Sequence, residues 1–487
     1  MALKKIAFRD VLKKISMSIE KASLRFQNVV LFLLIFFTTA INGQKNDIHL
    51  PVFKEGETIV FFGNSITHGG TYHTFINLYY KTRFPEKNIK MINCGVAGDQ
   101  IPHGIRRFET DVLVHNPDII VMMFGMNDSG VHNITPKDSE KEKKAKLQSR
   151  IDNYQHNLDS ASSIIANKGI RMVYIAPTIY DDVADVETPV RYGGNKALGM
   201  CRDVVFEIAE KYQSPVVDFY TIMNAINARY QPNDPSFTVV GKDRVHPGKD
   251  GHLLMAYQFL KSQQAPGLIS EISLDASKVQ VIQMRNCTVE AFSVGDGVIY
   301  FTAKSIALPF PVSGNEACNW VPVNKAFNNE ILQISGLVKS NYALYIDDDS
   351  VGVYTQAELA DGINLALNQQ TPQYKQALLV SKINDNRTAL VRDRIRSLAF
   401  FDYGFLKNMP VNQPLDSIAQ FFEKELVKIE DKPYYPYVKE QTKNYLMFRP
   451  QLHQTKQAVS FMEQSMHLSA QPIWHKYKLV QVDKTMP

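Results

Sequence analysis

Between residues 58 and 264 of this 487-residue chain, short apolar runs alternate with longer amphipathic stretches. Each run is too short and too uniformly apolar to form a surface helix, which favours strands buried on both faces. The predicted strands are residues 59–62, 90–94, 119–124, 172–176 and 215–219. The predicted helices lie near residues 72–83, 103–115, 148–168, 195–213 and 249–263. Five such repeats indicate one α/β domain over residues 46–266, a parallel sheet covered by helices on both faces.

Beyond residue 266 the pattern changes. Period-two runs such as 279–283 and 298–303 predict a β-rich segment over residues 267–355. Residues 356–487 are expected to form a mainly helical C-terminal region.

A β-hairpin is predicted within the β-rich segment, with residues 343–346 and 351–354 as its strands. The turn between them contains three consecutive aspartates, 347–349, but lacks the later Gly and Glu of an EF-hand calcium loop. We therefore interpret it as a polar turn.

The charge of the chain is concentrated at its N-terminus. The first 43 residues hold seven Lys or Arg against Asp10 and Glu20, which accounts for the whole formal net charge of +5. The remainder is close to neutral and offers only a mixed-sign run at 137–146, whereas a nucleic-acid partner would need a basic stripe. The composition therefore disfavours nucleic-acid binding.

Residues 1–43 have the three parts of a secretory signal peptide: a basic stretch, the apolar run 29–37, and small residues at 40–43. Nine apolar residues are too few to cross a bilayer, which takes about 20. We expect a secreted or periplasmic protein that meets a membrane only through this leader during export. An uncleaved leader that anchors the protein is the alternative. The basic stretch is long, so we also hypothesise that translation starts at Met17.

The four cysteines do not identify the redox compartment. Cys94 lies in a predicted strand and is expected to be a small buried hydrophobe. Cys287 and Cys318 both lie in the β-rich segment and could pair in an exported protein, although their spacing does not show it. No Cys-x-x-Cys or His-rich spacing indicates zinc, so no metal is expected.

Candidate catalytic residues follow the predicted strands, where parallel sheets carry their sites. Ser65 comes directly after the first strand, but a lone serine there is weak support because Ser is a common helix N-cap. Ester hydrolysis through a serine also needs a base and a carboxylate that orients it. Asp243 precedes His246 by three residues, so it can fold back onto Nδ1 and leave Nε2 facing the serine. An Asp-capped turn with a structural His is the alternative.

Two further residues can supply hydrogen-bond donors to a developing oxyanion. Gly98 follows the second strand and lets its N–H approach a substrate closely, and Asn127 follows the third strand and carries a side-chain amide. Taken alone, each is better explained as an ordinary turn residue, and only the combination favours an oxyanion hole.

Four segments together resemble, in order and spacing, the sequence blocks of the SGNH (GDSL-like) hydrolases. They are Gly-Asn-Ser-Ile-Thr at 63–67, Asn-Cys-Gly-Val-Ala-Gly-Asp at 93–99, Gly-Met-Asn-Asp at 125–128 and Asp-Arg-Val-His at 243–246. The resemblance implies the SGNH hydrolase fold, a flavodoxin-like, doubly wound, parallel five-stranded sheet. It also implies Ser65 as nucleophile, His246 as base and Asp243 as its orienter, with no metal or organic cofactor. The N–H groups of Ser65 and Gly98 and the Asn127 amide would form the oxyanion hole.

One position departs from the family pattern. The usual Gly-Asp-Ser reads Gly-Asn-Ser here, with Asn64 in place of aspartate. An asparagine keeps the hydrogen-bonding shape and loses the charge, so we expect a modest change in how the serine turn is held and no loss of catalysis.

The expected function is hydrolysis of carboxylic esters, acetyl esters of carbohydrates in particular, on small-molecule or polysaccharide substrates. This expectation combines family analogy with the export signal. A lysophospholipase or thioesterase of the same fold, and a non-catalytic carbohydrate-binding protein, are the alternatives. Residues 178–195 are interpreted either as the lining of a polar substrate cleft or as a solvated loop. Residues 342–366 resemble a region appended to the esterase domain in some secreted bacterial SGNH proteins, with no chemistry assigned.

Overall fold

A computed structural model describes residues 48–130, 134–135, 137–410, 413–432 and 434–482. The predicted signal peptide, with Met17 and the apolar run 29–37, lies outside the described residues. The fold below is that of the compact unit that begins at Leu50. Among the described residues, no helix combines the length and the apolar composition that a membrane crossing requires.

All five predicted strands form a single parallel sheet in the order β2-β1-β3-β4-β5. Their bounds are β1 (Thr58–Gly63), β2 (Lys90–Gly95), β3 (Ile119–Met123), β4 (Arg171–Ala176) and β5 (Val216–Asp218). This is the flavodoxin-like order, in which ligands bind beyond the carboxyl ends of the strands beside β1. The predicted fold class is therefore confirmed.

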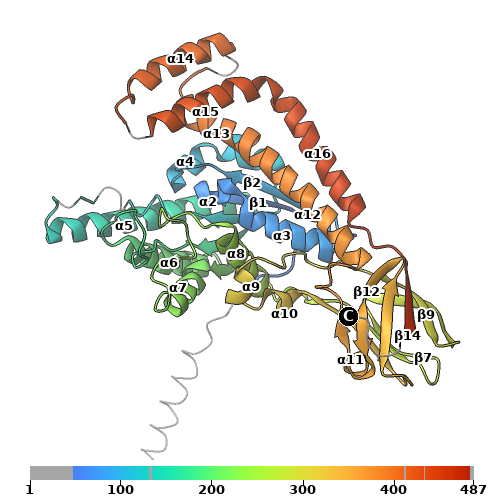
Figure 1. The fold of residues 1–487 in the computed structure, drawn as a ribbon. Coiled ribbons are helices and arrows are strands. Elements are labelled where there is room, and N and C mark those ends of the chain that lie inside the picture. The colour runs from blue at the N-terminus through green and yellow to red at the C-terminus, as the bar shows by residue number, and fades with distance from the viewer. Residues whose placement is uncertain (1–47, 131–133, 136, 411–412, 433, 483–487) are drawn as a thin grey trace, which may run out of the picture. The chain divides into compact units, whose positions relative to one another are not determined.

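Helices cover both faces of this sheet (Figure 1). On one face pack α3 (Thr71–Arg83), α7 (Phe219–Tyr230) and α8 (Lys249–Ser262); on the other pack α4 (Ile101–Arg106), α5 (Glu140–Ala166) and α6 (Gly194–Lys211). The alternation of β1 shows the division, because Ile59 and Phe61 join one hydrophobic cluster and Val60 and Phe62 join the other. The sheet is thus buried on both sides, as its uniformly apolar strands predicted.

Three helical elements differ from the sequence-based expectation. Helix α7 was not predicted: β5 ends at Asp218, whose carboxylate accepts the N–H of Thr221 and caps α7. Helix α5 begins at Glu140, earlier than expected, because Ser139 and Glu142 form a capping box. The helix expected at 103–115 is instead three short turns, α4, η1 (Phe108–Val112) and η2 (Leu113–His115).

After α8 the chain forms two further sheets, ordered β13-β10-β6-β7 and β12-β11-β14-β9-β8. Their strands are β6 (Leu268–Asp275), β7 (Gln280–Arg285), β8 (Cys287–Gly295), β9 (Val298–Ser305), β10 (Asn329–Ser335), β11 (Asn341–Ile346), β12 (Asp349–Thr355), β13 (Ile363–Asn364) and β14 (His475–Val482). The predicted hairpin is present as β11–β12. Its turn is tighter than expected, because Ile346 already pairs with Asp349.

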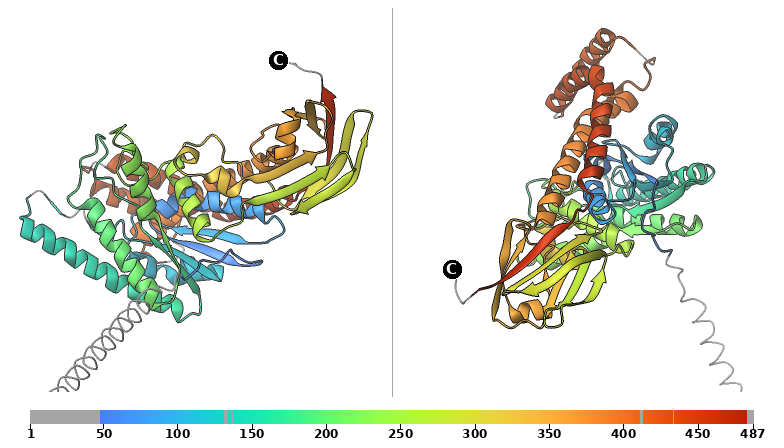
Figure 2. Two further views of the ribbon diagram at one scale, coloured as in Figure 1. Left: turned by 90° about the horizontal axis from the view of Figure 1, so that it is seen from below. Right: turned by 90° about the vertical axis from the view of Figure 1, so that its right-hand side faces the viewer.

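The described residues from 356 onward are mainly helical, as expected, and strand β14 is the main exception. It inserts between β11 and β9, and its red arrow lies among the yellow and orange strands in Figure 2. Tyr477 and Leu479 are buried while Lys476 and Lys478 are exposed, so this segment alternates as a strand with one face on the core.

The remaining elements are helical. They are α2 (Ser65–Gly69), α9 (Ala317–Trp320), α10 (Val323–Phe327), α11 (Gln356–Asp361), α12 (Pro372–Leu390), η4 (Val391–Arg396), α13 (Ser397–Phe400), η5 (Phe401–Phe405), α14 (Leu415–Val427), α15 (Tyr435–Phe448), η6 (Arg449–Gln451) and α16 (Leu452–Ser469). Helix α12 packs against both α3 and α16 (Figure 1). Val380 of α12 and Met466 of α16 belong to the same hydrophobic cluster as β1, so the C-terminal helices share a core with the main sheet.

The four cysteines are unpaired. Cys94 and Cys201 are buried, which agrees with the interpretation of Cys94 as a small hydrophobe. The thiols of Cys287 and Cys318 lie 3.4 and 3.5 Å from the carbonyl oxygens of Glu271 and Val312 respectively, so the disulfide considered from sequence does not form.

Glu330 of β10 is a carboxylic acid in an apolar position. It is 3% exposed, and its Oε2 has no hydrogen-bond partner. Desolvation raises the pKa of Glu330 to about 7, although the charge of Arg83 acts in the opposite direction. Below about pH 7 the folded protein therefore keeps this carboxyl group protonated.

We expect Glu330→Gln to stabilise the protein at pH 8. The unfolded carboxyl group ionises above about pH 4.5, whereas the folded one resists ionisation until about pH 7, so wild-type stability falls between these values. The gain in the free energy of unfolding should be about 2–3 kcal/mol at pH 8 and vanish below about pH 4. Urea denaturation across this pH range measures it, with the more exposed Glu271→Gln as control. An equal difference at pH 4 and pH 8 would contradict the assignment.

Candidate active site

Ser65 begins helix α2 directly after strand β1. The preceding residue, Asn64, is the N-cap, and its Oδ1 accepts the N–H of Ile66 at 3.1 Å. Asn and Asp are similarly good caps, and Asn64 is 1% exposed, a position where a neutral amide costs less to bury than a carboxylate. The departure from the usual Gly-Asp-Ser therefore leaves the turn before Ser65 intact.

A series of hydrogen bonds joins Ser65 to the two residues of the Asp-Arg-Val-His segment. The Oγ of Ser65 lies 2.8 Å from Nε2 of His246, and Nδ1 of His246 lies 2.6 Å from Oδ2 of Asp243. The other carboxylate oxygen accepts the N–H groups of Val245 and His246, both at 3.0 Å. The serine and the carboxylate thus contact opposite nitrogens of one imidazole, the arrangement that lets a histidine act as a base.

Asp243 is held in its ionised form. Partial desolvation opposes ionisation, but hydrogen bonds from the His246 ring and from the N–H groups of His246 and Val245 outweigh it and lower the pKa of Asp243 to about 2. An ionised Asp243 fixes the proton of the imidazole on Nδ1, which leaves the Nε2 lone pair directed at Ser65.

Arg244 holds the segment that carries Asp243 and His246, and sequence reasoning missed it. Its backbone has a φ of +68°, a conformation that costs a non-glycine residue about 1–2 kcal/mol. The guanidinium is buried and donates four hydrogen bonds of 2.6 to 3.2 Å to backbone carbonyls of the segment after β4, those of Asp181, Ala184, Val186 and Thr188. In return, the Arg244 carbonyl accepts the N–H of Asp181 at 3.0 Å.

Gly98 lies in a tight turn after β2. The N–H of Asp99 donates to the carbonyl of Val96 at 3.2 Å, and Gly98 takes a φ of +78° at the third position of this turn, where glycine is favoured. A Cβ at Gly98 would meet no atom within 4 Å, so the requirement for glycine is conformational and the space above the turn is open.

Asn127, after β3, is tied to the same turn. Its Nδ2 donates to the carbonyl of Asp99 at 2.9 Å, and its own backbone carbonyl accepts Nε2 of Gln100 at 2.9 Å. An amide carries two hydrogens, so one remains after the bond to Asp99. Because β2 and β3 flank β1, the loops of Gly98 and Asn127 stand on either side of the strand that leads to Ser65.

Asp128 links the loops of Gly98 and Asn127 through hydrogen bonds, a role that the sequence did not predict. Its two carboxylate oxygens accept the N–H groups of Ile101 at 2.8 Å and Gly125 at 3.0 Å. Desolvation raises the pKa of Asp128 to about 6, against the lowering effect of these backbone bonds. The carboxylate thereby links the start of α4 to the loop that presents Asn127.

The segment 178–195 is partly buried in the core and partly exposed to a cavity. Tyr180 and Asp181 are buried, and Asp181 accepts side-chain hydrogen bonds from Asn227 and Gln231, so both are structural. Asp182 and Asn195 line a cavity of about 450 Å³ beside α7, with both polar and apolar walls. The cleft interpretation thus fits part of this segment.

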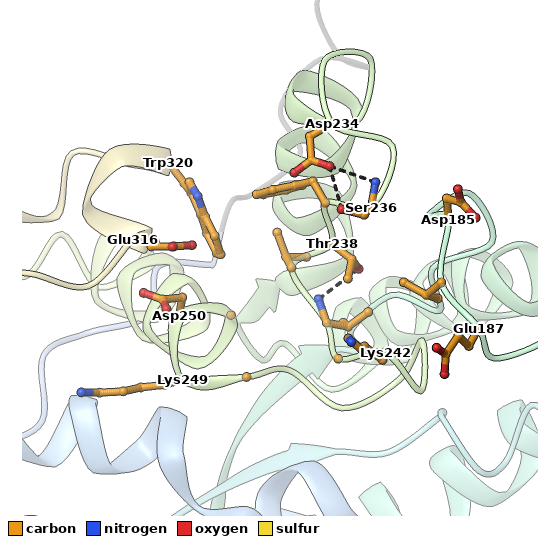
Figure 3. A pocket seen from close by; sticks show the side chains of 17 residues that line it. Asp185, Glu187, Asp234, Ser236, Thr238, Lys242, Lys249, Asp250, Glu316 and Trp320 are labelled. Carbon is orange, nitrogen blue, oxygen red and sulfur yellow. Dashed lines mark hydrogen bonds between the residues drawn. The ribbon is translucent and has the colours of Figure 1, made fainter.

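A larger cavity, of about 730 Å³, adjoins the segment that carries Asp243 and His246 (Figure 3). Residues on both sides of that segment line it, including Lys242 and Lys249. Trp320 and Glu316 stand on one side of the cavity, and Asp185 and Glu187 stand on the other. In the described part of the chain, no group of three or more His, Cys, Asp or Glu side chains is arranged to hold a metal ion.

Known proteins resemble the part of the chain that carries this site. The model of the GDSL-like lipase/acylhydrolase family matches residues 61–254. The acetylxylan esterase of Geobacillus stearothermophilus is 26% identical over 221 residues, which cover 42% of this chain and 93% of the relative. An uncharacterized lipoprotein of Bacillus subtilis is 28% identical over 111 residues, 21% of this chain and 41% of the relative.

A solved structure resembles most of the chain. A gut microbial diltiazem-metabolizing enzyme superposes with a TM-score of 0.78 and 30% sequence identity, over 89% of this chain and 99% of its own. The likeness therefore includes the sheets and helices after residue 266, whereas the acetylxylan esterase match covers only 42% of this chain.

We expect Arg244→Lys to lower the free energy of unfolding by about 2–4 kcal/mol, because a lysine cannot reproduce four hydrogen bonds from one planar group and buried carbonyls would lose their donors. Guanidinium denaturation measures the change. Arg191→Lys, in the exposed part of the same segment, is the matched control and should change stability by less than about 0.5 kcal/mol. Equal effects of the two substitutions would refute the role given to Arg244.

Proposed function

This chain belongs to the GDSL-like lipase/acylhydrolase family, the SGNH hydrolases, and is a hydrolase that acts on ester bonds; from that premise we propose that it is a serine esterase that uses Ser65 to deacetylate carbohydrates. The observation that carries the proposal is the hydrogen-bonded series of Ser65, His246 and Asp243. Residues 46–266 would form the catalytic part.

In the proposed acylation step, Oγ of Ser65 attacks the ester carbonyl carbon while Nε2 of His246 takes the hydroxyl proton. Asp243 stabilises the imidazolium that forms. The oxyanion of the tetrahedral intermediate would accept hydrogen bonds from the N–H groups of Ser65 and Gly98 and from the remaining amide hydrogen of Asn127. Collapse of the intermediate breaks the bond to the alcohol oxygen, which receives the proton from His246.

In the proposed deacylation step, water takes the place of the alcohol. His246 removes a proton from the water as its oxygen attacks the acyl-enzyme carbonyl, and the same three donors stabilise the second oxyanion. Ser65 then leaves as the hydroxyl, with the proton that His246 returns to it, and the carboxylic acid is released.

Two observations support a carbohydrate ester as substrate. One relative is an acetylxylan esterase whose length is almost fully covered by the match. Carboxylate and lysine side chains, including Asp185, Glu187, Lys242 and Lys249, also line part of the cavity that adjoins the Asp243–His246 segment, and such groups can hydrogen-bond a hydroxyl-rich alcohol partner.

We also propose that residues 1–43 are an export leader that is cleaved, so that the enzyme acts outside the cytoplasm. N-terminal sequencing of the mature protein tests this proposal. A mature N-terminus near residue 44 would support it, and an intact leader on the purified protein would indicate an anchor instead.

The activity test compares wild type with Ser65→Ala on 4-nitrophenyl esters of increasing acyl length and on acetylated xylan oligosaccharides. Loss of the nucleophile should lower kcat about 10⁴–10⁶-fold. Ser160→Ala, an exposed serine on α5, is the matched control and should retain wild-type activity. We expect acetate release to exceed release of longer acyl groups.

Two outcomes would count against the proposal. Equal turnover by wild type and Ser65→Ala would remove Ser65 as nucleophile. A preference that rises with acyl chain length would favour a lysophospholipase or thioesterase of the same fold.

A further inference from the structure

The C-terminal helical segment (residues 372–469) packs against the main α/β domain, and buried polar side chains of α12 and η4 form hydrogen bonds across the contact. Asn384 of α12 pairs with Asn77 of α3 at 2.8 Å, and Thr388 lies 2.7 Å from Thr74 Oγ1. The guanidinium of Arg387 donates to the carbonyl of Met91 in β2 at 2.8 Å. These contacts align α12 and η4 along strand β2, whose far end leads into the turn of Gly98.

Arg396, at the end of η4, reaches that turn. It is 3% exposed, and its Nε donates to the carbonyl of Gly95, the last residue of β2, at 2.9 Å. Its two terminal nitrogens donate to the two carboxylate oxygens of Asp111 at 2.8 and 2.7 Å. This fork geometry is specific to arginine, because a lysine presents a single point charge.

The contacts of Asp111 continue to the other end of the turn. Asp111 also accepts a hydrogen bond from Arg107, whose Nε donates to Asp99 at 2.8 Å and whose Nη2 donates to the carbonyl of Gly63 at 3.3 Å. Arg396 thus holds residue 95 directly and residue 99 through two intermediates. Gly98, a proposed oxyanion donor, lies between them.

The end of β2, where this turn begins, packs directly against helix α2. A Cβ on Gly95 would lie 2.2 Å from the backbone nitrogen of His68, so the end of β2 is in direct contact with the backbone of α2. Ser65 is the first residue of that helix.

We infer that Arg396 is a positioning residue of the active site, and that the C-terminal helical segment completes the esterase by fixing the turn that presents Gly98. This inference rests on the proposed function. Arg396 contacts no reacting atom; it acts through the Gly95 carbonyl and through Asp111. In transition-state stabilisation a donor displaced by about 1 Å loses most of its effect, so the expected deficit is in kcat.

The test compares Arg396→Gln with Arg387→Gln in the full-length protein. Each substitution removes one buried guanidinium that donates a hydrogen bond to a backbone carbonyl of β2. Arg387 donates to Met91 within the strand, whereas Arg396 donates to Gly95, where the turn of Gly98 begins. We expect Arg396→Gln to lower kcat for 4-nitrophenyl acetate about 10–100-fold with KM within about threefold, and Arg387→Gln to change kcat less than about threefold. Both should lower thermal stability, Arg396→Gln more than Arg387→Gln, so kcat is compared at a temperature at which both variants are folded.

Amide hydrogen exchange supplies a readout that does not depend on turnover. Exchange at residues 95–100 should accelerate at least tenfold in Arg396→Gln and remain at the wild-type rate in Arg387→Gln. If Arg396→Gln does not fold, Arg396→Lys replaces it, since it keeps an ion pair with Asp111 but cannot also bond Gly95, and its kcat should fall at least threefold.

The two proposals fail in different ways. Equal kcat and equal exchange at 95–100 in the two glutamine variants would overturn the role of Arg396, as would wild-type kcat in Arg396→Lys. Absence of Ser65-dependent ester hydrolysis in the wild-type protein would overturn the proposed function. Faster exchange in Arg396→Gln alone would then still support the contact between Arg396 and the turn.

Discussion

Four buried charged side chains hold the turn of Gly98 and the C-terminal helices together. Asp99, Arg107, Asp111 and Arg396 are each less than 9% exposed, and each carboxylate faces a guanidinium. Removing one member of such a set costs about 3–5 kcal/mol, because the partner is left as an uncompensated charge. The end of β2, the turns after it and the C-terminal helical segment therefore cannot separate, and the extension is part of the same folded body as the sheet.

Close backbone contacts connect these charged residues to the helix that begins with Ser65. Gly95 contacts the backbone of α2, and a Cβ on Gly63 would lie 2.6 Å from Oγ1 of Thr67 in the same helix. Helix α2, which begins with Ser65, therefore packs on the ends of the adjacent strands β1 and β2. Arg244 ties the Asp243–His246 segment to backbone carbonyls after β4. Ser65, His246 and the proposed oxyanion donors are consequently held by backbone contacts as well as by their own hydrogen bonds.

Much of the fold was predictable from the sequence, and each omission has its own physical cause. The five strands were found because a sheet buried on both faces needs uniformly apolar runs. Helix α7 was missed because Asp218 ends the strand and caps the helix within one residue, which leaves no linker as a signal. Strand β14 was missed because its partners lie far away in sequence: His475 pairs with Ala303, and its eight residues alternate too briefly beside a long helical stretch.

The sequence by itself determined the local chemistry. Asp243 and His246 are three residues apart, so the bond between them depends only on a short turn, and glycine and serine at the end of β1 follow from the same local rules. Only the tertiary structure placed Ser65 against His246, which is 181 positions away, because the order of parallel strands brings the two loops together. It also decided the roles of Arg244 and Arg396. Their main acceptors include backbone carbonyls, and because every residue carries one, such a bond leaves no signature in the sequence of the partner.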